Sequence, residues 1–331
     1  PGVNIYRTPF NGRNFEYLGE DPFLASTMVV PYIKGVQKNG IAACVKHFAL
    51  NNQEHLRDKI NVEVSDRALY EIYLPAFKAA VQEGKVWALM GAYNKFRGQY
   101  TTHNKILNKI LKTDWGYDGV VISDWSSVHS TKEAALYGVD MEMGTGTDGL
   151  GTTTNNHYQH YYLANPFLKA LKKGELSEDL VNDKVRRILR LIYRTSLNPN
   201  RALGKMNNKE HHKVARKIAT EGIVLLKNED NFFPIKDKKG LTIAVIGENA
   251  TRNMTQGGGS SQLKPLFEVS PLEGLRARYK NAKIIHTMGF ESGASVYDEV
   301  IPASLNQDSL YVKAIEVAKK ADIVLFVGGL N

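Results

Sequence analysis

Residues 119–125 read Gly-Val-Val-Ile-Ser-Asp-Trp. Three branched apolar side chains between a glycine and a polar pair are typical of a short buried strand, and we expect this strand to be parallel to its neighbours. Asp124 stands where the strand ends. The carboxyl ends of parallel strands carry the chemistry in many α/β proteins, but an aspartate at such a place also often caps the following helix. The surrounding sequence bears on this choice.

The segments on both sides of Asp124 alternate between strand and helix patterns. Strands are expected at residues 3–5, 41–45, 86–92 and 139–143, and helices at 22–39, 65–83, 104–113 and 131–137. Pro75 lies inside the second of these helices and predicts a kink or a restart there. Repeated strand–helix units with polar residues at the strand ends predict a barrel or a doubly wound sheet.

The chain continues with a second α/β pattern. Residues 145–162 are rich in Gly, Thr, Asn, His and Tyr and predict a long loop on the active side. A helix is expected at 178–193, with an inward face made of Leu180, Val185, Ile188, Leu189 and Ile192. Residues 198–208 hold a proline, a glycine and several asparagines, which predict a domain boundary.

Beyond this boundary the sequence predicts a further set of elements. Helices are expected at residues 211–226, 271–279 and 310–320, and strands at 242–247, 283–285 and 324–327. The chain begins at Pro1 without a methionine and stops at Asn331, where a strand runs into a glycine turn. We therefore expect a fragment of a longer protein at both ends.

Composition narrows the classes of function. The 331 residues carry a net charge of +9, but the lysines are scattered, which favours a solvated basic surface over a nucleic-acid partner. No window approaches 18 consecutive apolar residues, so no membrane span is expected. Cys44 is the one cysteine, and no Cys or His cluster has zinc spacing. Residues 257–259 are glycines, but their spacing does not match a dinucleotide fingerprint.

One group of residues follows strands or lies in strand-end loops. It comprises Arg13, Lys46, His47, Arg57, Tyr93, Asp124, Trp125 and Asp140. An acid, several hydrogen-bond donors and two aromatic rings are the side chains of a sugar pocket, because aromatic rings stack on the apolar face of a pyranose and charged groups bind its hydroxyls.

Five motifs in this region resemble those of the β-glucosidases of glycoside hydrolase family 3. They are Gly-Arg-Asn-Phe-Glu-Tyr at 12–17 with Glu-Asp-Pro at 20–22, Lys-His-Phe-Ala-Leu-Asn-Asn-Gln-Glu at 46–54, Ser-Asp-Arg-Ala-Leu-Tyr-Glu-Ile-Tyr at 65–73, Gly-Ala-Tyr-Asn at 91–94 and Ser-Asp-Trp at 123–125. In that family, Lys-His-Phe followed by Pro-Gly-His marks the N-acetylglucosaminidase branch. Here Ala49 follows instead, so the chain resembles the β-glucosidase branch.

The resemblance implies a fold and a set of domains. It implies an α/β protein with a (β/α)8-type, TIM-like barrel over residues 1–197, N-terminally incomplete here. A linker at 198–208 and a truncated α/β sandwich domain at 209–331 would follow. The chain then resembles the middle segment of a longer enzyme, whose remaining N- and C-terminal parts are its expected partners. An oligomer is possible, and a periplasmic or secreted location is expected at the level of the family.

The resemblance also implies a reaction and its residues. The family's enzymes are retaining and exo-acting, and they release terminal non-reducing β-D-glucosyl residues from β-glucosides or oligosaccharides such as cellobiose. Asp124 matches the nucleophile, and Trp125 matches the aromatic residue beside the sugar. The residues that match those holding the glucose are Arg13, Lys46, His47, Arg57 and Tyr93, and Ser260 matches a residue of the second domain that reaches over the sugar. No metal or other cofactor is implied.

The second carboxyl group of a retaining site is expected outside the chain. By the family's spacing the acid/base glutamate falls beyond Asn331, and another glucose-binding carboxylate falls before Pro1. Candidates inside the chain fit that position poorly: Glu248, Glu268, Glu273 and Glu291. We therefore expect the 331-residue segment by itself to lack glucosidase turnover.

Two other functions remain open. A relative acting on xylosides or arabinosides differs in the depth of its pocket, which the sequence does not settle. A non-catalytic carbohydrate-binding relative on the same fold is disfavoured by Asp124, because a binding protein needs no buried acid at that point.

Overall fold

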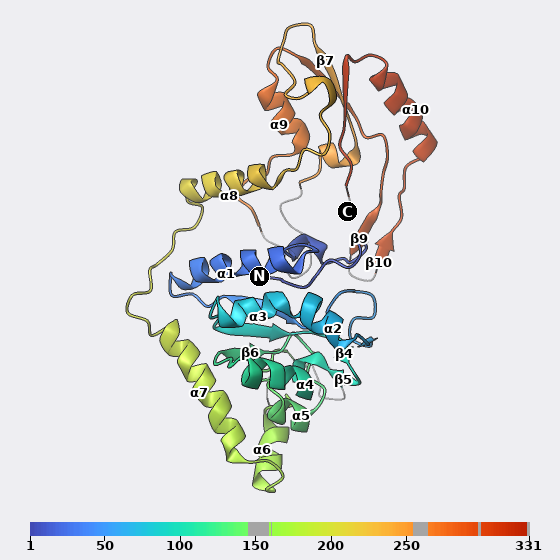
Figure 1. Cartoon of the computed structure of the whole chain (residues 1–331). Helices are drawn as coiled ribbons and strands as arrows, with labels where there is room; N and C mark the ends of the chain where they lie inside the picture. The colour runs from blue at the N-terminus through green and yellow to red at the C-terminus, as the bar shows by residue number, and fades with distance from the viewer. Residues whose placement is uncertain (145–158, 160, 254–263, 297–298, 330–331) are drawn as a thin grey trace. The chain divides into compact units, whose positions relative to one another are not determined.

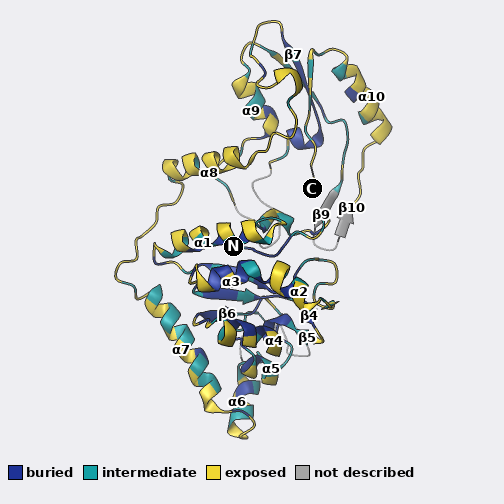
Figure 2. Ribbon diagram, in the orientation of Figure 1, coloured by how far each residue is buried: buried dark blue, intermediate teal, exposed yellow. Residues whose placement is uncertain are grey.

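A computed structural model describes residues 1–144, 159, 161–253, 264–296 and 299–329. These residues form two compact units, Pro1–Leu203 and Gly204–Asn331. The boundary between the units falls within residues 198–208. Each unit contains hydrophobic clusters of its own (Figure 2).

Short helices and strands alternate through the first unit (Figure 1). Its strands are β1 (Cys44–Phe48), β2 (Asn61–Val62), β3 (Ala88–Gly91), β4 (Lys95–Phe96), β5 (Gln99–Tyr100) and β6 (Val120–Ile122). Its α-helices are α1 (Pro22–Gln37), α2 (Asp66–Ala68), α3 (Pro75–Gln82), α4 (Lys105–Asn108), α5 (Thr131–Leu136), α6 (Asn165–Lys172) and α7 (Glu178–Arg194). Short 3-10 or π turns lie at η1 (Asn14–Glu16), η2 (Leu69–Tyr73), η3 (Thr101–His103) and η4 (Lys109–Asp114).

A parallel three-stranded sheet with the order β1-β3-β6 lies at the centre of this unit. Ala88 pairs with Cys44 on one side and with Val120 on the other. The three strands are therefore aligned, and their carboxyl ends meet at one edge of the sheet. Three strands are part of a barrel, but no closed barrel is seen among the described residues, so the complete (β/α)8 barrel stays a prediction.

The prediction of a regular strand at 139–143 is wrong. Within this segment Met141 forms an isolated parallel bridge to Ile122, and no regular strand is present. The side chain of Asp140 explains the interruption. Its Oδ2 accepts the Val121 N–H at 2.8 Å, which takes up a donor that a neighbouring strand would use. A second side chain acts similarly, since Ser123 Oγ accepts the Met143 N–H at 2.8 Å.

The predicted restart at Pro75 is confirmed. Ser65 caps α2 by accepting the Ala68 N–H, a π turn follows at η2, and Pro75 opens α3 at its first position. Proline suits that position because its missing N–H has no partner in a first turn. Helix α3 packs against α1, and the buried Phe77 and Ile33 belong to the same core.

The expected inward face of α7 is only partly correct. Leu180 and Ile188 are partly buried, but Val185, Leu189 and Ile192 are 44%, 48% and 36% exposed. Helix α7 contacts α5 and β6. Lys184 is the buried residue of this helix, and its ammonium donates to the Val139 carbonyl at 2.6 Å.

The second unit is built on a parallel sheet with the order β11-β7-β8. Its strands are β7 (Thr242–Ile246), β8 (Lys283–Thr287), β9 (Ala294–Val296), β10 (Glu299–Ile301) and β11 (Ile323–Phe326). Its α-helices are α8 (Lys209–Gly222), α9 (Pro271–Arg278) and α10 (Gln307–Ala318). Short 3-10 turns lie at η6 (Glu229–Asn231) and η7 (Glu248–Ala250). The antiparallel pair of β9 and β10 was not expected from the sequence. Gly247 ends β7 at φ +137°, where a Cβ would lie 2.1 Å from the Val327 carbonyl oxygen, so the position requires glycine.

Candidate active site

The carboxylate of Asp124 lies at the carboxyl end of β6 and is 10% exposed. Its Oδ1 accepts hydrogen bonds from Tyr93 Oη at 3.0 Å and from the Trp125 N–H at 2.8 Å. Its Oδ2 lies 3.6 Å from His47 Nε2. The next helix, α5, is capped by Ser130 rather than by Asp124. The helix-cap interpretation is therefore wrong, and one carboxylate oxygen is held while the other faces His47.

His47 is fixed at the end of β1 by its own backbone. Asn4 accepts the His47 N–H at 2.7 Å and donates to the His47 carbonyl at 2.9 Å. Tyr17 Oη lies 3.3 Å from Nδ1 of the ring. Burial, and then the positive charges of Arg13, Lys46 and Arg57, hold the pKa of His47 well below its ordinary value. The ring is therefore neutral at pH 7 and acts through hydrogen bonds rather than through charge.

Two acids orient the three cations around this site. Glu16 forms ion pairs with Arg13 and, at 2.8 Å, with Lys46 Nζ. Glu54 forms an ion pair with Arg57 at 2.5 Å. The Arg57 guanidinium also lies 4.2 Å from the centre of the Tyr93 ring. A cation above an aromatic ring is attracted to its π face, so this contact fixes Arg57 beside the Tyr93 hydroxyl.

Glu16 and Glu54 were not among the expected site residues. A local signal was present, because each acid stands three residues from an arginine: Arg13 with Glu16, and Glu54 with Arg57. Acid and base at that spacing meet within one turn. The second bond of Glu16, to Lys46, joins segments 30 positions apart in the chain and required the tertiary structure.

The remaining expected residues differ in their placement. Trp125 is 54% exposed, so its indole is open to a ligand. Ser260 lies outside the described residues. Asp140 is wrong as a member of a sugar pocket, because its side chain is fully buried and forms an ion pair with Lys112 at 2.8 Å. It joins a helix to the neighbouring strand instead.

A pair of hydroxyls braces the loop that carries Asp124. Ser127 Oγ donates to the Asp124 carbonyl at 3.0 Å and lies 3.0 Å from Thr102 Oγ1. Thr102 Oγ1 donates to the Ala92 carbonyl at 2.7 Å. Ala92 directly precedes Tyr93. The brace therefore ties the end of β3 to the end of β6 and keeps Tyr93 Oη within reach of Asp124.

Three of the four glutamates considered for the acid/base role have structural partners. Glu248 accepts hydrogen bonds from Ser292 N and Oγ. Glu273 forms a capping box with Ser270 at the start of α9. Glu291 accepts the backbone N–H groups of Ser304 and Leu305. These bonds give each of the three carboxylates a structural role.

The described part of the chain offers neither a metal-binding cluster nor a membrane-spanning helix. No three His, Cys, Asp or Glu side chains gather there in a way that could hold a metal ion. Within the same residues, no helix combines the length and the apolar character needed to cross a bilayer.

Fold and site together define an α/β protein with a braced, cation-rimmed carboxylate at the strand ends. Comparison with known proteins gives the family. Residues 1–191 match the glycosyl hydrolase family 3 N-terminal domain, and residues 223–331 match the glycosyl hydrolase family 3 C-terminal domain. The chain belongs to glycosyl hydrolase family 3.

Several named relatives are similar to the whole chain. A β-glucosidase of Bacteroides ovatus is 53% identical over 339 residues, covering 100% of this chain and 45% of the relative. The thermostable β-glucosidase B of Acetivibrio thermocellus is 38% identical, covering 100% of this chain and 41% of the relative. The chain therefore spans less than half the length of these relatives.

Solved structures show the same likeness. The structure of β-glucosidase 3B from Thermotoga neapolitana in complex with glucose matches with a TM-score of 0.83 at 34% identity, covering 100% of this chain and 46% of that one. A family 3 β-glucosidase from Bifidobacterium adolescentis matches with a TM-score of 0.78 at 34% identity, covering 98% and 44%.

Proposed function

We propose that the full-length protein is a retaining exo-β-glucosidase in which Asp124 is the nucleophile. The observation that carries the proposal is the asymmetric environment of the carboxylate. Tyr93 and the Trp125 N–H both bind Oδ1, while the contact of Oδ2 among the described residues is the neutral His47 ring at 3.6 Å. An oxygen without a close donor keeps its lone pairs for attack.

The proposed reaction has two steps. Oδ2 of Asp124 attacks the anomeric carbon as the bond to the aglycone oxygen breaks, and a second carboxylic acid protonates that leaving oxygen. Water, activated by the resulting carboxylate, then releases the sugar with its configuration retained. A retaining site needs two carboxyl groups about 5 Å apart. We propose that the acid/base glutamate follows Asn331 in the full-length protein.

The proposed sugar-binding residues have chemistry that suits this substrate. Lys46, Arg13 and Arg57 donate to hydroxyls, and their acids Glu16 and Glu54 fix their directions. His47 can donate without adding charge. The open indole of Trp125 offers a flat surface for a sugar ring. Ser260 is proposed as a further contact.

The choice of glucose over a pentose rests on the relatives. Those with high identity over this chain are named β-glucosidases. A β-xylosidase or arabinosidase of the same family is the second candidate. Steady-state comparison of aryl β-glucoside, β-xyloside and α-arabinoside substrates discriminates them, and we expect the highest kcat/KM for the glucoside.

The test of the nucleophile is covalent labelling with a 2-fluoro-glucoside. Mass spectrometry of the full-length protein should show one added fluoroglucosyl group, on the peptide that contains Asp124. Asp124→Asn should remove the label. Asp118→Asn is a matched control, since Asp118 is an exposed acid six residues earlier that pairs with Arg194, and it should label normally.

Other outcomes separate the alternatives. A label on another peptide, with activity present, would show that the nucleophile is misassigned. Activity on a xyloside without labelling by the glucoside reagent supports the pentosidase. Sugar binding without label or turnover supports a non-catalytic carbohydrate-binding protein.

A further inference from the structure

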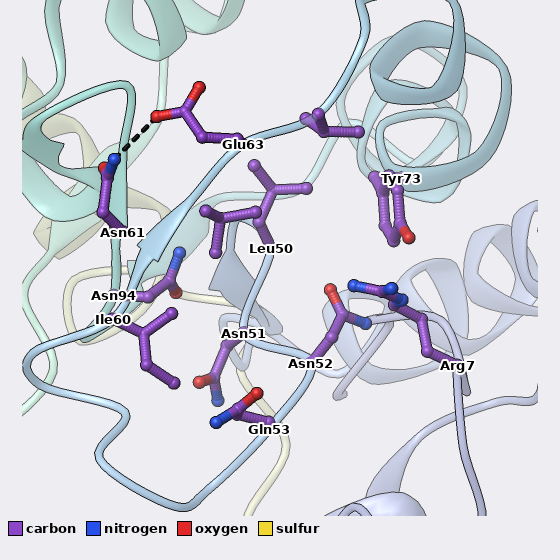
Figure 3. Close-up of a pocket in the computed structure, with 12 residues that line it drawn as sticks. Arg7, Leu50, Asn51, Asn52, Gln53, Ile60, Asn61, Glu63, Tyr73 and Asn94 are labelled. Atoms are coloured by element: carbon purple, nitrogen blue, oxygen red, sulfur yellow. Dashed lines mark hydrogen bonds between the residues drawn. The ribbon is translucent and has the colours of Figure 1, made fainter.

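The short turn η3 contacts the segments that follow β3 and β6. Thr101 fastens it to the first of these, because its N–H donates to the Asn94 carbonyl at 2.9 Å and its hydroxyl lies 3.0 Å from the same oxygen. The Asn94 side chain donates in turn to the Ala49 carbonyl in the loop after β1. That loop and Asn94 line the pocket shown in Figure 3. Turn η3 is therefore a fixed support at the strand ends.

Two consecutive residues of η3 hold the loop between β6 and α5. This loop, residues 123–130, carries Asp124 and is called the Asp124 loop below. Thr102 Oγ1 lies 3.0 Å from Ser127 Oγ, as described above. His103 Nε2 accepts the His129 N–H at 3.2 Å. The loop is thus anchored to η3 at two points beyond the acid.

The Asp124 loop contains a residue in the left-handed region of the backbone. Ser126 has a φ of +60°, which is unfavourable for a residue with a Cβ atom. Its hydroxyl donates to the Gly144 carbonyl at 2.7 Å, and the anchors at Ser127 and His129 follow directly. A strained backbone persists only where the surrounding contacts hold it. Loss of an anchor therefore lets the loop relax, two residues away from Asp124.

The bond to His129 fixes the protonation of the His103 ring. A backbone N–H only donates, so Nε2 has a lone pair and the neutral ring has its proton on Nδ1. The side chain is 1% exposed, and Nδ1 lies 3.0 Å from Glu133 Oε2 on α5. That oxygen lies off the line of the ring N–H, so the contact is electrostatic rather than a linear hydrogen bond. Gln99 Nε2 donates to the other oxygen of Glu133 at 2.8 Å and keeps the carboxylate in place.

A second proton on His103 disrupts this arrangement. Both ring nitrogens then carry hydrogens, and Nε2 presents a donor to the donor of His129. Burial lowers the pKa of His103 to about 4; among the neighbouring charges Glu133 raises this pKa and His129 lowers it. The other elements packed against η3 add the Tyr100 ring on β5 and the exposed Lys105 on α4, while β3 has no ionisable side chain. The ring is therefore neutral, and the anchor intact, well above pH 4.

We propose that His103 is a positioning residue for the proposed nucleophile. In its neutral form, with the proton on Nδ1, it anchors the Asp124 loop through the His129 N–H. Its protonation frees that loop, and the carboxylate of Asp124 then loses its direction of attack. Glu133 faces the ring and favours the incoming proton. This role rests on the proposed function of Asp124 and requires no contact between His103 and the sugar.

The test measures the rate of labelling at Asp124 by a 2-fluoro-glucoside in the full-length protein. His103→Leu removes the acceptor of the His129 N–H, whereas His103→Gln replaces it with an amide oxygen that does not titrate. At neutral pH we expect His103→Leu to label about tenfold or more slowly, because a small misplacement of a reacting group has an effect of that size. His103→Gln should stay within about threefold of the native rate. The kcat on an aryl glucoside should fall more than KM changes, since the sugar contacts remain.

The pH profile of labelling is a readout that lost stability does not move. The loss of rate on acidification should begin at a higher pH in the native protein than in His103→Gln, because only the native ring takes up a proton. Glu133→Gln removes the charge that raises the pKa of His103, so it should move the acid loss to lower pH. The same change made in the His103→Gln protein should have no such effect.

Gln37→Leu is the matched control for a lost acceptor. Gln37 Oε1 on α1 accepts the Trp87 N–H at 2.9 Å, before the amino end of β3 and away from the Asp124 loop. His103→Leu and Gln37→Leu each leave one backbone N–H without its side-chain acceptor. We expect Gln37→Leu to lower stability and to label at the native rate.

The outcomes separate the positioning role from the proposed function. If the native protein is labelled on Asp124, equal rates in His103→Leu and Gln37→Leu overturn the positioning role alone. So does His103→Gln that is as slow as His103→Leu, or an acid loss that is the same in native and His103→Gln proteins. A native protein without label on Asp124 overturns the proposed function, and the positioning role with it. If His103→Leu does not fold, the pH profiles of His103→Gln and Glu133→Gln decide.

Discussion

Replacing Tyr93 with phenylalanine removes one hydrogen bond from the Asp124 carboxylate and leaves the other contacts of the ring in place. Tyr93 Oη donates to Oδ1 at 3.0 Å, while the Arg57 guanidinium stacks over the ring at 4.2 Å. Phenylalanine keeps the ring for Arg57 and loses only the donor. Burial, and then the negative charge of Asp124, raise the pKa of Tyr93 above its ordinary value, so the hydroxyl stays protonated and donates throughout the working range of pH.

The size of the effect follows from the character of the bond. Hydrogen bonds to charged groups contribute about 1.5–3 kcal/mol. If Oδ1 loses one of its two donors, Asp124 is free to turn away from the direction of attack. Since about 1.4 kcal/mol is a factor of ten in rate, we expect the rate of glycosylation to fall by about 10- to 150-fold.

The assay is the rate of covalent labelling by a 2-fluoro-glucoside, together with kcat on an aryl glucoside, in the full-length protein. Tyr117→Phe is the matched control. Tyr117 is buried near the opposite end of β6, and its hydroxyl donates to the Val120 carbonyl at 2.9 Å. Both variants lose one hydroxyl that donates a hydrogen bond, but only Tyr93→Phe should slow the chemistry. Equal rates in the two variants, or a loss below about twofold in Tyr93→Phe, would refute the reasoning.

Three further predictions concern stability. Thr102→Val should lower the free energy of unfolding by about 1–3 kcal/mol in urea titrations, because the buried contacts of the Thr102 hydroxyl with the Ala92 carbonyl and with Ser127 are lost. Thr27→Val on α1 is the control, and it should change the free energy of unfolding little because the Thr27 hydroxyl is exposed. Asp140→Ala should cost about 1–3 kcal/mol, because the buried Val121 N–H loses its acceptor and the partly buried Lys112 loses its nearest carboxylate. Asp66→Ala at an exposed pair should cost at most about 1 kcal/mol. Burial lowers the pKa of His103 to about 4 in the folded protein, whereas a histidine in the unfolded chain has a pKa of about 6.5. Between about pH 4 and 6.5 the unfolded state therefore binds a proton at His103 that the folded state does not bind. The free energy of unfolding should fall as the pH falls through this window. His103→Gln should flatten that slope, and an unchanged slope would contradict the assignment.

Local sequence predicts only some strands of the first unit. The strands expected at 86–92 and around 120–122 match β3 and β6, whereas the strand expected at 41–45 begins only at Cys44 and residues 3–5 form no strand. The short strands β2, β4 and β5 were not expected. The run 120–122 has no charged side chain and branched residues at each position, so it has to be buried on both faces, as the structure shows. Pro75 marks a helix start by its missing N–H, and Asn104 caps α4 by accepting two N–H groups. Such features depend on neighbours in the chain, and sequence patterns describe them well.

The character of the site was also predictable in part. Asp124 was expected at a strand end, and the structure brings it together with Tyr93 and His47. Parallel strands place their carboxyl ends at one edge, so polar residues after each strand converge. The roles of Glu16 and Glu54 in fixing the cations were not recognised, although their local spacing offered a signal.

Other features depended on contacts between distant segments. Asp140 has the sequence context of a site residue, yet its carboxylate is committed to Lys112 and Val121. The apolar stripe of α7 has the period of a buried face, yet three of its five side chains stay exposed. The sequence by itself determined the alternation of strands and helices and the acid at the end of β6. The tertiary structure alone decided which polar groups pair with one another, because that depends on distances between segments far apart in the chain.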